Sequence, residues 1–251
     1  MRKSLVHIII RILLKILTCT DDSAIKAVPH NGPLILIGNH INFLDAPVAF
    51  TPLYPRPVVA LVKEETFENP LLRFLFNTWG SISVKRGTAD FKALGQALQA
   101  LKQGKLLAVS PEGTRTNDGR LIQGQPGIVA IAIKSQVPIL PIVLYGSEVF
   151  RENIRKLKRT TIKIQVGKPF KIKSDSHQPG REERQQITDE IMYQMAVMLP
   201  EEYRGYYSDM DQMTTDYLQF LPWDLASDGT RWQQVADTIG KHLPAAEVAP
   251  K

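Results

Sequence analysis

The sequence predicts an α/β protein in which a largely parallel sheet is flanked by helices. Short apolar runs bounded by glycine, proline or polar residues, such as 34–37 and 106–109, are typical of buried strands. Longer amphipathic segments such as 89–103 are typical of helices. Strands that alternate with helices favour parallel pairing, with helices on both faces of the sheet. At 251 residues the chain is long enough for one sizeable core.

Each predicted element has a local signal in the sequence. The helix after the 34–37 strand is expected to begin near Asp45 and to end at the prolines that follow. Pro70 is expected in the first turn of the next helix, where its missing N–H costs nothing. Gly104 ends the helix at 89–103, and Pro200 closes the last one. The other expected elements are strands at 57–62, 80–86, 105–109, 138–144 and 161–166, and helices at 127–135 and 181–199.

A histidine and an aspartate follow the first strand. His40 and Asp45 are five positions apart, and open α/β sheets bind ligands beyond the carboxyl ends of their strands. Asp45 can hold one ring nitrogen of His40, which leaves the other nitrogen free as a general base. No Ser or Cys stands beside this pair, so removal of a proton from a substrate hydroxyl is favoured over a covalent intermediate. The alternative is a histidine that only caps the next helix.

Two further strand ends carry polar groups. Ser110-Pro111-Glu112-Gly113-Thr114-Arg115 follows the strand at 106–109. Its glycine allows a ligand to approach the backbone, and the guanidinium of Arg115 matches the geometry of a phosphate. The strand at 80–86 ends in the cations Lys85 and Arg86. A surface turn and a solvated strand end are the alternatives for these two segments.

Four segments in this order resemble the motifs of the glycerolipid acyltransferase family, whose best-known type is 1-acylglycerol-3-phosphate acyltransferase. They lie at 39–45, 80–86, 111–115 and 137–142, and the resemblance spans about residues 30–205. The chain departs from the family in one loop. Many members have Phe and a basic residue there, whereas residues 123–127 of this chain are Gln-Gly-Gln-Pro-Gly.

The resemblance implies transfer of a fatty acyl group from a thioester carrier to the free hydroxyl of lysophosphatidic acid, which gives phosphatidic acid in phospholipid biosynthesis. His40 and Asp45 would be the catalytic pair, and backbone amides near Gly113 or at the start of the following helix would stabilise the oxyanion. The expected substrate-binding residues are Lys63, Arg86, Glu112, Gly113, Thr114 and Arg115, in which the arginines clamp the acceptor phosphate. By resemblance Glu112 belongs to the acceptor site.

The expected partners are a phospholipid surface, a lyso-lipid acceptor and an acyl thioester donor, either acyl-CoA or an acylated carrier protein. No tightly bound cofactor is expected, and no Cys/His or carboxylate cluster has the spacing of a metal site. Two other functions stay open at this point. One is acylation of another lyso-lipid or a non-phosphate acceptor, and the other is a non-catalytic membrane lipid-binding protein.

The net charge of +6 is unevenly distributed. Residues 201–251 hold nine acidic and four basic side chains, whereas 151–173 hold nine basic side chains and one acidic. Such a positive stretch attracts anionic partners, although a solvated face is the alternative. Nucleic acid is not expected, because the basic stretch has one aromatic residue and no reader module. Cys19 is the only cysteine, which fits a reducing compartment.

The first 20 residues are predicted to form an amphipathic membrane-associating helix. The polar residues His7, Arg11, Lys15 and Thr18 share one narrow helical stripe, and the rest of residues 5–18 is Leu, Ile or Val. The apolar run is too short to span a bilayer, and its internal cations do not fit a signal peptide. We expect a peripheral or monotopic protein on the cytoplasmic face of a membrane. The alternative is a core helix docked on the domain.

Three regions follow from these patterns. Residues 1–20 form the N-terminal helix, 21–205 the acyltransferase-like domain, and 206–251 an acidic C-terminal appendage of unknown role.

Overall fold

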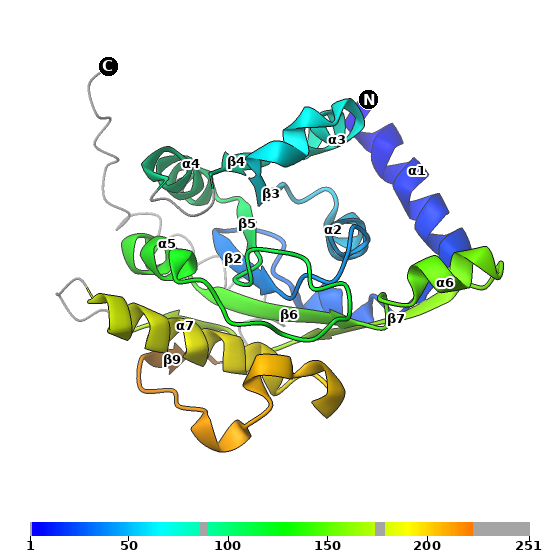
Figure 1. Cartoon of the computed structure of the whole chain (residues 1–251). Helices are drawn as coiled ribbons and strands as arrows, with labels where there is room; N and C mark the ends of the chain where they lie inside the picture. Colours follow the sequence, from blue (N-terminus) through cyan, green and yellow to red (C-terminus); the bar gives the residue numbers. More distant parts are fainter. Residues whose placement is uncertain (1, 86–89, 174–178, 223–251) are drawn as a thin grey trace.

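The computed structural model describes residues 2–85, 90–173 and 179–222. Its described strands form one mixed sheet of nine, with helices on both faces (Figure 1). The order across the sheet is β1-β7-β6-β2-β5-β3-β4, and β8 pairs with β6 and β9. The strands are β1 (Thr18–Thr20), β2 (Leu34–Gly38), β3 (Val58–Lys63), β4 (Ile82–Val84), β5 (Leu106–Val109), β6 (Ile139–Tyr145), β7 (Thr160–Val166), β8 (Phe170–Ile172) and β9 (Leu218–Phe220).

Five neighbouring strands, β6, β2, β5, β3 and β4, run parallel to one another. Their carboxyl ends therefore meet at one edge of the sheet. The antiparallel pairs are β6 with β7, β6 with β8, and β8 with β9, while β1 runs parallel to β7. The predicted α/β class, with a largely parallel sheet flanked by helices, is confirmed.

Alternate residues of the central strand β2 enter two different cores. Ile35 and Ile37 pack in one, and Leu34 and Leu36 pack in the other, as the two-residue period of a strand requires. Because both faces are covered, all four side chains are buried. The covering helices are α1 (Arg2–Leu17), α2 (Asp45–Phe50), α3 (Pro70–Trp79), α4 (Phe91–Lys102), α5 (Gly127–Ser135), α6 (Phe150–Arg155) and α7 (Arg181–Ala196).

The two cores belong to different sets of helices. Helices α4, α5 and α7 pack in the core of Ile35, and α2 and the first residue of α6 pack in the core of Leu34. Figure 1 shows α4, α5 and α7 on one side of the sheet, and α1, α2 and α6 on the other. The loop between β2 and α2 lies at the carboxyl edge, where His40 was expected.

Helix α1 packs on the domain through one stripe and exposes the opposite stripe. Leu14 and Leu17 contact the core of Leu34, and the ring of His7 lies 4.4 Å from that of Tyr54. Six apolar side chains of the other stripe are 48–61 % exposed: Leu5, Ile8, Ile9, Ile12, Leu13 and Ile16. Among the described helices none has the length and apolarity to cross a membrane. The helix ends at Leu17, because the next three residues form the edge strand β1.

Residues 206–222, which were expected to form part of an appendage, lie against the same sheet. Tyr207 is 1 % exposed, and its hydroxyl accepts a hydrogen bond from the Gly124 amide and donates one to Asp189. Strand β9 pairs with β8 and continues the sheet. The buried carboxylate of Glu190 accepts hydrogen bonds from Thr214, Asp216 and Tyr217. The rest of the predicted appendage, 223–251, lies outside the described residues.

Candidate active site

His40 and Asp45 form a hydrogen-bonded pair at the carboxyl edge of the sheet. Strand β2 ends at Gly38, and Asp45 is the first residue of α2, so a short loop carries the histidine. Nδ1 of His40 lies 2.7 Å from Oδ2 of Asp45. The His40 side chain is 25 % exposed and that of Asp45 is 7 % exposed, so the pair has a buried and an accessible end.

The same aspartate oxygen fixes the histidine tautomer. Oδ2 of Asp45 also accepts the amide hydrogens of Ile41 and Asn42, at 2.7 and 2.9 Å. Because this oxygen already accepts two main-chain amides, it also faces Nδ1 of His40 as an acceptor, and the tautomer that fits is the one in which Nδ1 donates. Nε2 is then left with a lone pair and has no hydrogen-bond partner among the described residues. This is the arrangement that a general base requires.

Glu112 holds the main chain of His40. Its Oε1 accepts the amide hydrogen of His40 at 2.7 Å, and its Oε2 accepts that of Ile122 at 3.2 Å. The side chain is 2 % exposed. Burial raises its pKa to about 7, against the opposing effect of the two amide hydrogen bonds. The carboxylate expected at the acceptor site therefore has main-chain partners on both of its oxygens.

The segment after Glu112 continues this contact with the histidine loop. The amide of Thr116 donates to the His40 carbonyl at 2.9 Å, and that of Asn117 donates to the Ile41 carbonyl at 3.0 Å. Both main-chain polar groups of His40 are thus bonded to the segment that follows β5. Gly113 has a φ of 69°, a left-handed conformation that favours glycine. Its amide donates to the Ser110 carbonyl, so this particular amide already has an acceptor inside the loop.

The predicted substrate-binding cations follow the parallel strands to the same edge. Thr114 and Arg115 come after β5 and are exposed. Lys63 ends β3, and its Nζ lies 2.9 Å from the Glu65 carboxylate. Arg86 lies outside the described residues, two positions after the end of β4. The topology thus brings Lys63 and Arg115 to the edge that carries His40.

Two asparagines support the histidine loop, and sequence reasoning gave them no role. Asn39 is buried, and its side-chain amide both donates to the carbonyl of Leu144 and accepts from the amide of Leu144, at 2.8 and 2.9 Å. Asn42 donates to the Ser147 carbonyl at 2.8 Å. These bonds fasten the loop to β6 and to the turn after it. A polar amide directly after a buried strand is the sequence signal that could have indicated this role.

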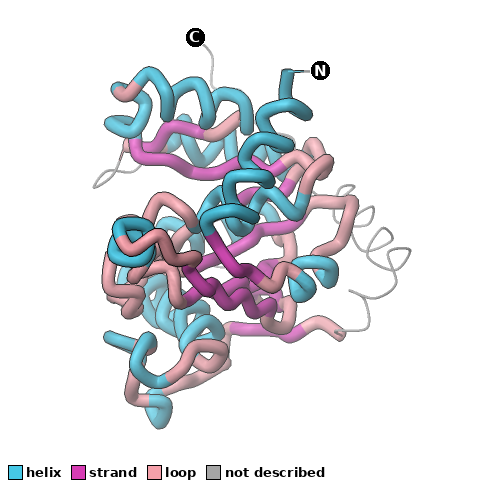
Figure 2. The backbone as a smooth tube through the Cα atoms, turned by 90° about the vertical axis from the view of Figure 1, so that its right-hand side faces the viewer, coloured by secondary structure: helices cyan, strands magenta, loops and turns pink. Residues whose placement is uncertain are grey.

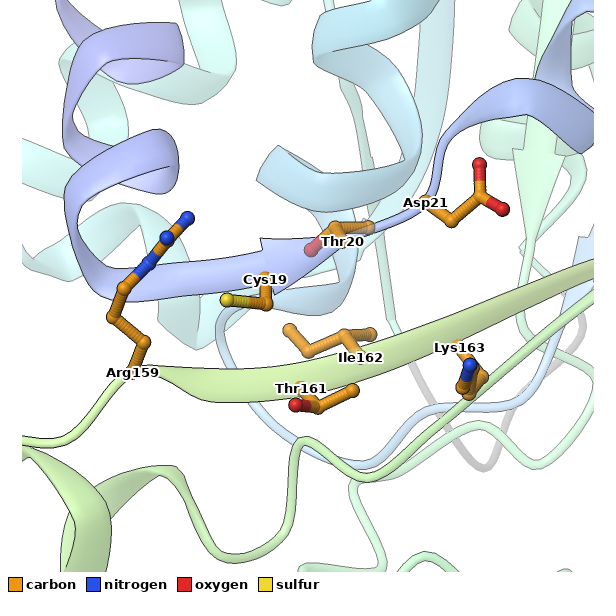
Figure 3. A pocket seen from close by; sticks show the side chains of 7 residues that line it. All are labelled: Cys19, Thr20, Asp21, Arg159, Thr161, Ile162 and Lys163. Atoms are coloured by element: carbon orange, nitrogen blue, oxygen red, sulfur yellow. The ribbon is translucent and has the colours of Figure 1, made fainter.

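The described residues contain no group of three His, Cys, Asp or Glu side chains that could hold a metal ion. An open hollow lies over the β1–β7 edge, and Figure 3 shows the side chains that line it: Cys19, Thr20, Asp21, Arg159, Thr161, Ile162 and Lys163. None of the predicted site residues lines this hollow. The candidate site is therefore the His40–Asp45 pair with its surroundings.

A model of the family described as Acyltransferase matches residues 20–145, which is half of the chain. The chain belongs to the acyltransferase family. The matched residues run from β1 to the end of β6 and include the His40 loop and the segment after β5. The family match thus covers the part of the chain in which the histidine pair is assembled.

Relatives of this chain carry more specific names. It is 29 % identical over 49 % of its length to the 1-acyl-sn-glycerol-3-phosphate acyltransferase of Borreliella burgdorferi, of which it covers 50 %. It is 30 % identical over 45 % of its length to the lyso-ornithine lipid O-acyltransferase of Pseudomonas aeruginosa, of which it covers 43 %. The chain thus spans about half the length of these two curated relatives.

A solved structure shares the fold of this chain. The crystal structure of the 1-acyl-sn-glycerophosphate (LPA) acyltransferase PlsC from Thermotoga maritima matches with a TM-score of 0.50 and 23 % sequence identity. The match covers 71 % of this chain and 70 % of the other. It supports the α/β architecture described above.

Proposed function

We propose that this acyltransferase moves a fatty acyl group from a thioester to the free hydroxyl of lysophosphatidic acid, giving phosphatidic acid. The observation that carries the proposal is the His40–Asp45 pair, in which the His40 side chain is 25 % exposed and its Nε2 has no partner among the described residues. The name of the Borreliella burgdorferi relative supports the choice of acceptor.

The proposed chemistry is general base catalysis. Nε2 of His40 takes the proton of the acceptor hydroxyl while that oxygen attacks the thioester carbonyl. Asp45 holds Nδ1–H and stabilises the imidazolium as it forms. The imidazolium then returns the proton to the sulfur as the thiol leaves. Proton transfer by a positioned side chain typically contributes about 10²–10⁴-fold to the rate.

The acceptor phosphate would be bound by cations at the same sheet edge. Arg115 is exposed and has no partner among the described residues, so its guanidinium is available for a bidentate contact. Arg86 and Lys63 are proposed as further contacts, and Gly113 and Thr114 would line the approach. Glu112 would act on the acceptor through the position of His40 rather than by direct contact.

The proposed donor is acyl-CoA or an acylated carrier protein. Either thioester supplies an activated carbonyl, so the reaction requires no tightly bound cofactor. The proposed location is the cytoplasmic face of a membrane, with α1 in the interface. The exposed apolar stripe of α1, with Arg11 and Lys15 beside it, supports this location.

A second candidate function is acylation of a different lyso-lipid. The name of the Pseudomonas aeruginosa relative favours it, since that protein is called a lyso-ornithine lipid O-acyltransferase. The two functions share the histidine pair and differ in the contacts to the acceptor head group.

A lipid panel tests both candidates. The purified protein is incubated with lysophosphatidic acid, lyso-ornithine lipid and other lyso-lipids, each with acyl-CoA and with acylated carrier protein, and the products are identified by mass spectrometry. We expect phosphatidic acid as the main product, and His40→Ala should abolish it without changing the melting temperature. Asp45→Asn should be nearly as severe, because an amide favours the wrong tautomer of His40.

The other outcomes of the lipid panel distinguish the remaining functions. A preferred product without phosphate would support the second candidate. Near wild-type acyl transfer by His40→Ala would refute the general base. Lipid binding without any product on the whole panel would leave a non-catalytic lipid-binding protein.

A further inference from the structure

The turn that ends α6 presents an apolar side chain that the fold does not use. Leu157 is 95 % exposed and has a φ of 52°. The amide of Lys158 donates to the Asn153 carbonyl at 2.8 Å, across a helix end in which Leu157 takes the left-handed position. Glycine is the usual residue there, since it adopts this conformation without strain. A leucine at this position stabilises neither the core nor the helix end.

Basic residues flank this leucine in the sequence. Arg151, Arg155 and Lys158 are exposed, and none has an ion-pair partner among the described residues. The only acidic residue of α6 is Glu152, which is paired with Lys156. Ile154 and Val149 add apolar surface, each 42 % exposed. An exposed apolar side chain in a segment with several exposed cations is complementary to an anionic bilayer surface.

The α6 turn is linked by hydrogen bonds to the end of α1. Figure 1 shows α1 and α6 on the same side of the molecule, and in Figure 2 that side faces the viewer. Arg159 joins the two elements, because its Nη2 donates to the Lys15 carbonyl at 2.8 Å and its Nε donates to the Thr18 carbonyl at 3.1 Å. Figure 3 shows Arg159 beside the last turn of α1. The two apolar surfaces are therefore held in a fixed relation.

The start of α6 is also tied to the catalytic loop. Asn42 bonds to Ser147, three residues before α6, and the ring of Phe43 lies 5.7 Å from that of Phe150. Phe43 itself is 48 % exposed. The loop that carries His40 is thus held by the element that presents the apolar turn.

We propose that the α6 turn is a second lipid contact of this protein, at which Leu157 enters an anionic bilayer surface and the flanking cations meet headgroup phosphates. With α1 it would define a plane that holds the His40 loop against the bilayer. The proposal rests on the membrane location proposed above and not on the identity of the acceptor.

Leu157→Gly in the full chain separates lipid contact from stability. Glycine suits the left-handed position, so the melting temperature should stay equal or rise. Binding to sedimented vesicles of equimolar phosphatidylcholine and phosphatidylglycerol should weaken about tenfold, as expected for the loss of one inserted leucine. Phe91→Ala is the matched control, since Phe91 is 78 % exposed at the start of α4, on the other side of the sheet. It should bind vesicles like the wild type.

Arg155→Gln with Lys158→Gln tests the charge component. At roughly 1 kcal/mol per cation near the surface, the pair should lose about thirtyfold in binding to the anionic vesicles and little on pure phosphatidylcholine. Activity on a short-chain, water-soluble acceptor should be unchanged in all these variants. That assay distinguishes failure of the lipid contact from failure of the proposed catalysis.

Three results would overturn the proposal. The first is wild-type vesicle binding by Leu157→Gly. The second is an equal loss of binding in Phe91→Ala. The third is unchanged vesicle binding together with a raised KM for a carrier-protein thioester, which would assign the turn to the donor protein. If Leu157→Gly lowers the melting temperature, Leu157→Asn replaces it, because asparagine also tolerates the left-handed conformation.

Discussion

At the scale of single residues, Glu112 is a buried carboxyl group whose pKa is raised to about 7, chiefly by burial. Since its ordinary pKa is near 4.5, the folded protein binds more protons than the unfolded chain between these two pH values. The contribution of Glu112 to stability is therefore complete below about pH 4.5 and is lost as the pH rises through about 7. The ionised carboxylate of Glu112 accepts the stronger hydrogen bond from the His40 amide, and burial disfavours this ionised form.

Glu112→Gln should remove this dependence on pH. The glutamine can still accept the His40 amide through its oxygen, although its NH₂ group faces the Ile122 amide. The free energies of unfolding of the two proteins should diverge by up to about 3 kcal/mol between pH 4.5 and 7, with the wild type losing stability relative to the variant as the pH rises. Urea denaturation at several pH values measures this difference. If the free energies of unfolding of the two proteins changed equally with pH, the pKa of Glu112 would not be raised by folding.

Arg115→Ala should weaken the use of a phosphate-bearing acceptor. A charge-assisted hydrogen bond contributes about 1.5–3 kcal/mol, so kcat/KM for that acceptor should fall roughly 10–150-fold. The KM for the thioester should stay near its wild-type value. Arg120→Ala is the control, because Arg120 is an exposed arginine of the same loop. Steady-state kinetics with each substrate varied would count against a phosphate contact if both substrates lost equally.

Of the site residues, the histidine pair was predictable from the sequence, whereas the burial of Glu112 was not. His40 and Asp45 are predictable as a pair because their spacing and their place after a buried strand are both visible in the sequence. The burial of Glu112 is not, since a glutamate between proline and glycine is most often a surface residue. Its partner is the main-chain amide of His40, 72 positions away. Because almost every residue has such an amide, the sequence does not indicate this contact.

At the scale of elements, prediction depends on length and context. The strands β2, β5 and β6 are apolar and buried on both faces, so their positions are predicted to within about two residues. The strands β1, β8 and β9 are absent from the prediction. Each has three residues, too few to establish a period of two by themselves, whereas the three-residue β4 lies within the longer run 80–86 that is predicted as a strand. Helix α6 is absent too, because its six residues are mostly polar and it packs through Phe150.

The exposed stripe and the packed stripe of helix α1 have different roles, and substitutions in each should have different effects. Ile9, Leu13 and Ile16 are exposed, so replacing all three with Ser should weaken vesicle binding and leave the melting temperature unchanged. Leu14 packs against the core, so Leu14→Ala should lower the melting temperature by several degrees without changing the lipid-facing surface. Vesicle sedimentation and thermal melting distinguish the two effects. A helix that only docks on the domain would bind vesicles equally well after the triple replacement.

At the scale of the whole molecule, residues 205–222 fasten elements that are distant in sequence. The Tyr207 hydroxyl bridges the Gly124 amide and the Asp189 carboxylate, while β9 adds to the sheet beside β8. The sequence boundary after residue 205 reflects the change in charge. The structure shows that side chains beyond this position are part of the main core, because Tyr207 packs there.

Tyr207→Phe should destabilise the folded protein by about 1–3 kcal/mol, because the buried Gly124 amide and the half-buried Asp189 carboxylate would each lose a partner. Tyr206→Phe is a matched control, since Tyr206 is 60 % exposed and removal of its hydroxyl should change little. Thermal melting of both variants measures the difference. Equal melting temperatures would mean that the bridge contributes nothing to stability.

The hydrogen bonds that hold the His40 loop also determine how much of the chain must be synthesised before the loop can take its final conformation. His40 and Asp45 leave the ribosome together, but Glu112 follows His40 by 72 positions, and Leu144 follows Asn39 by 105. Contacts of such long range form late, because their chain-closure entropy must first be overcome. A nascent chain that ends before β5 holds both side chains of the proposed catalytic pair but lacks the Glu112 and Leu144 contacts that hold the His40 loop in place. If the proposed acyl transfer needs this loop to be held in place, it requires a chain long enough to complete β6.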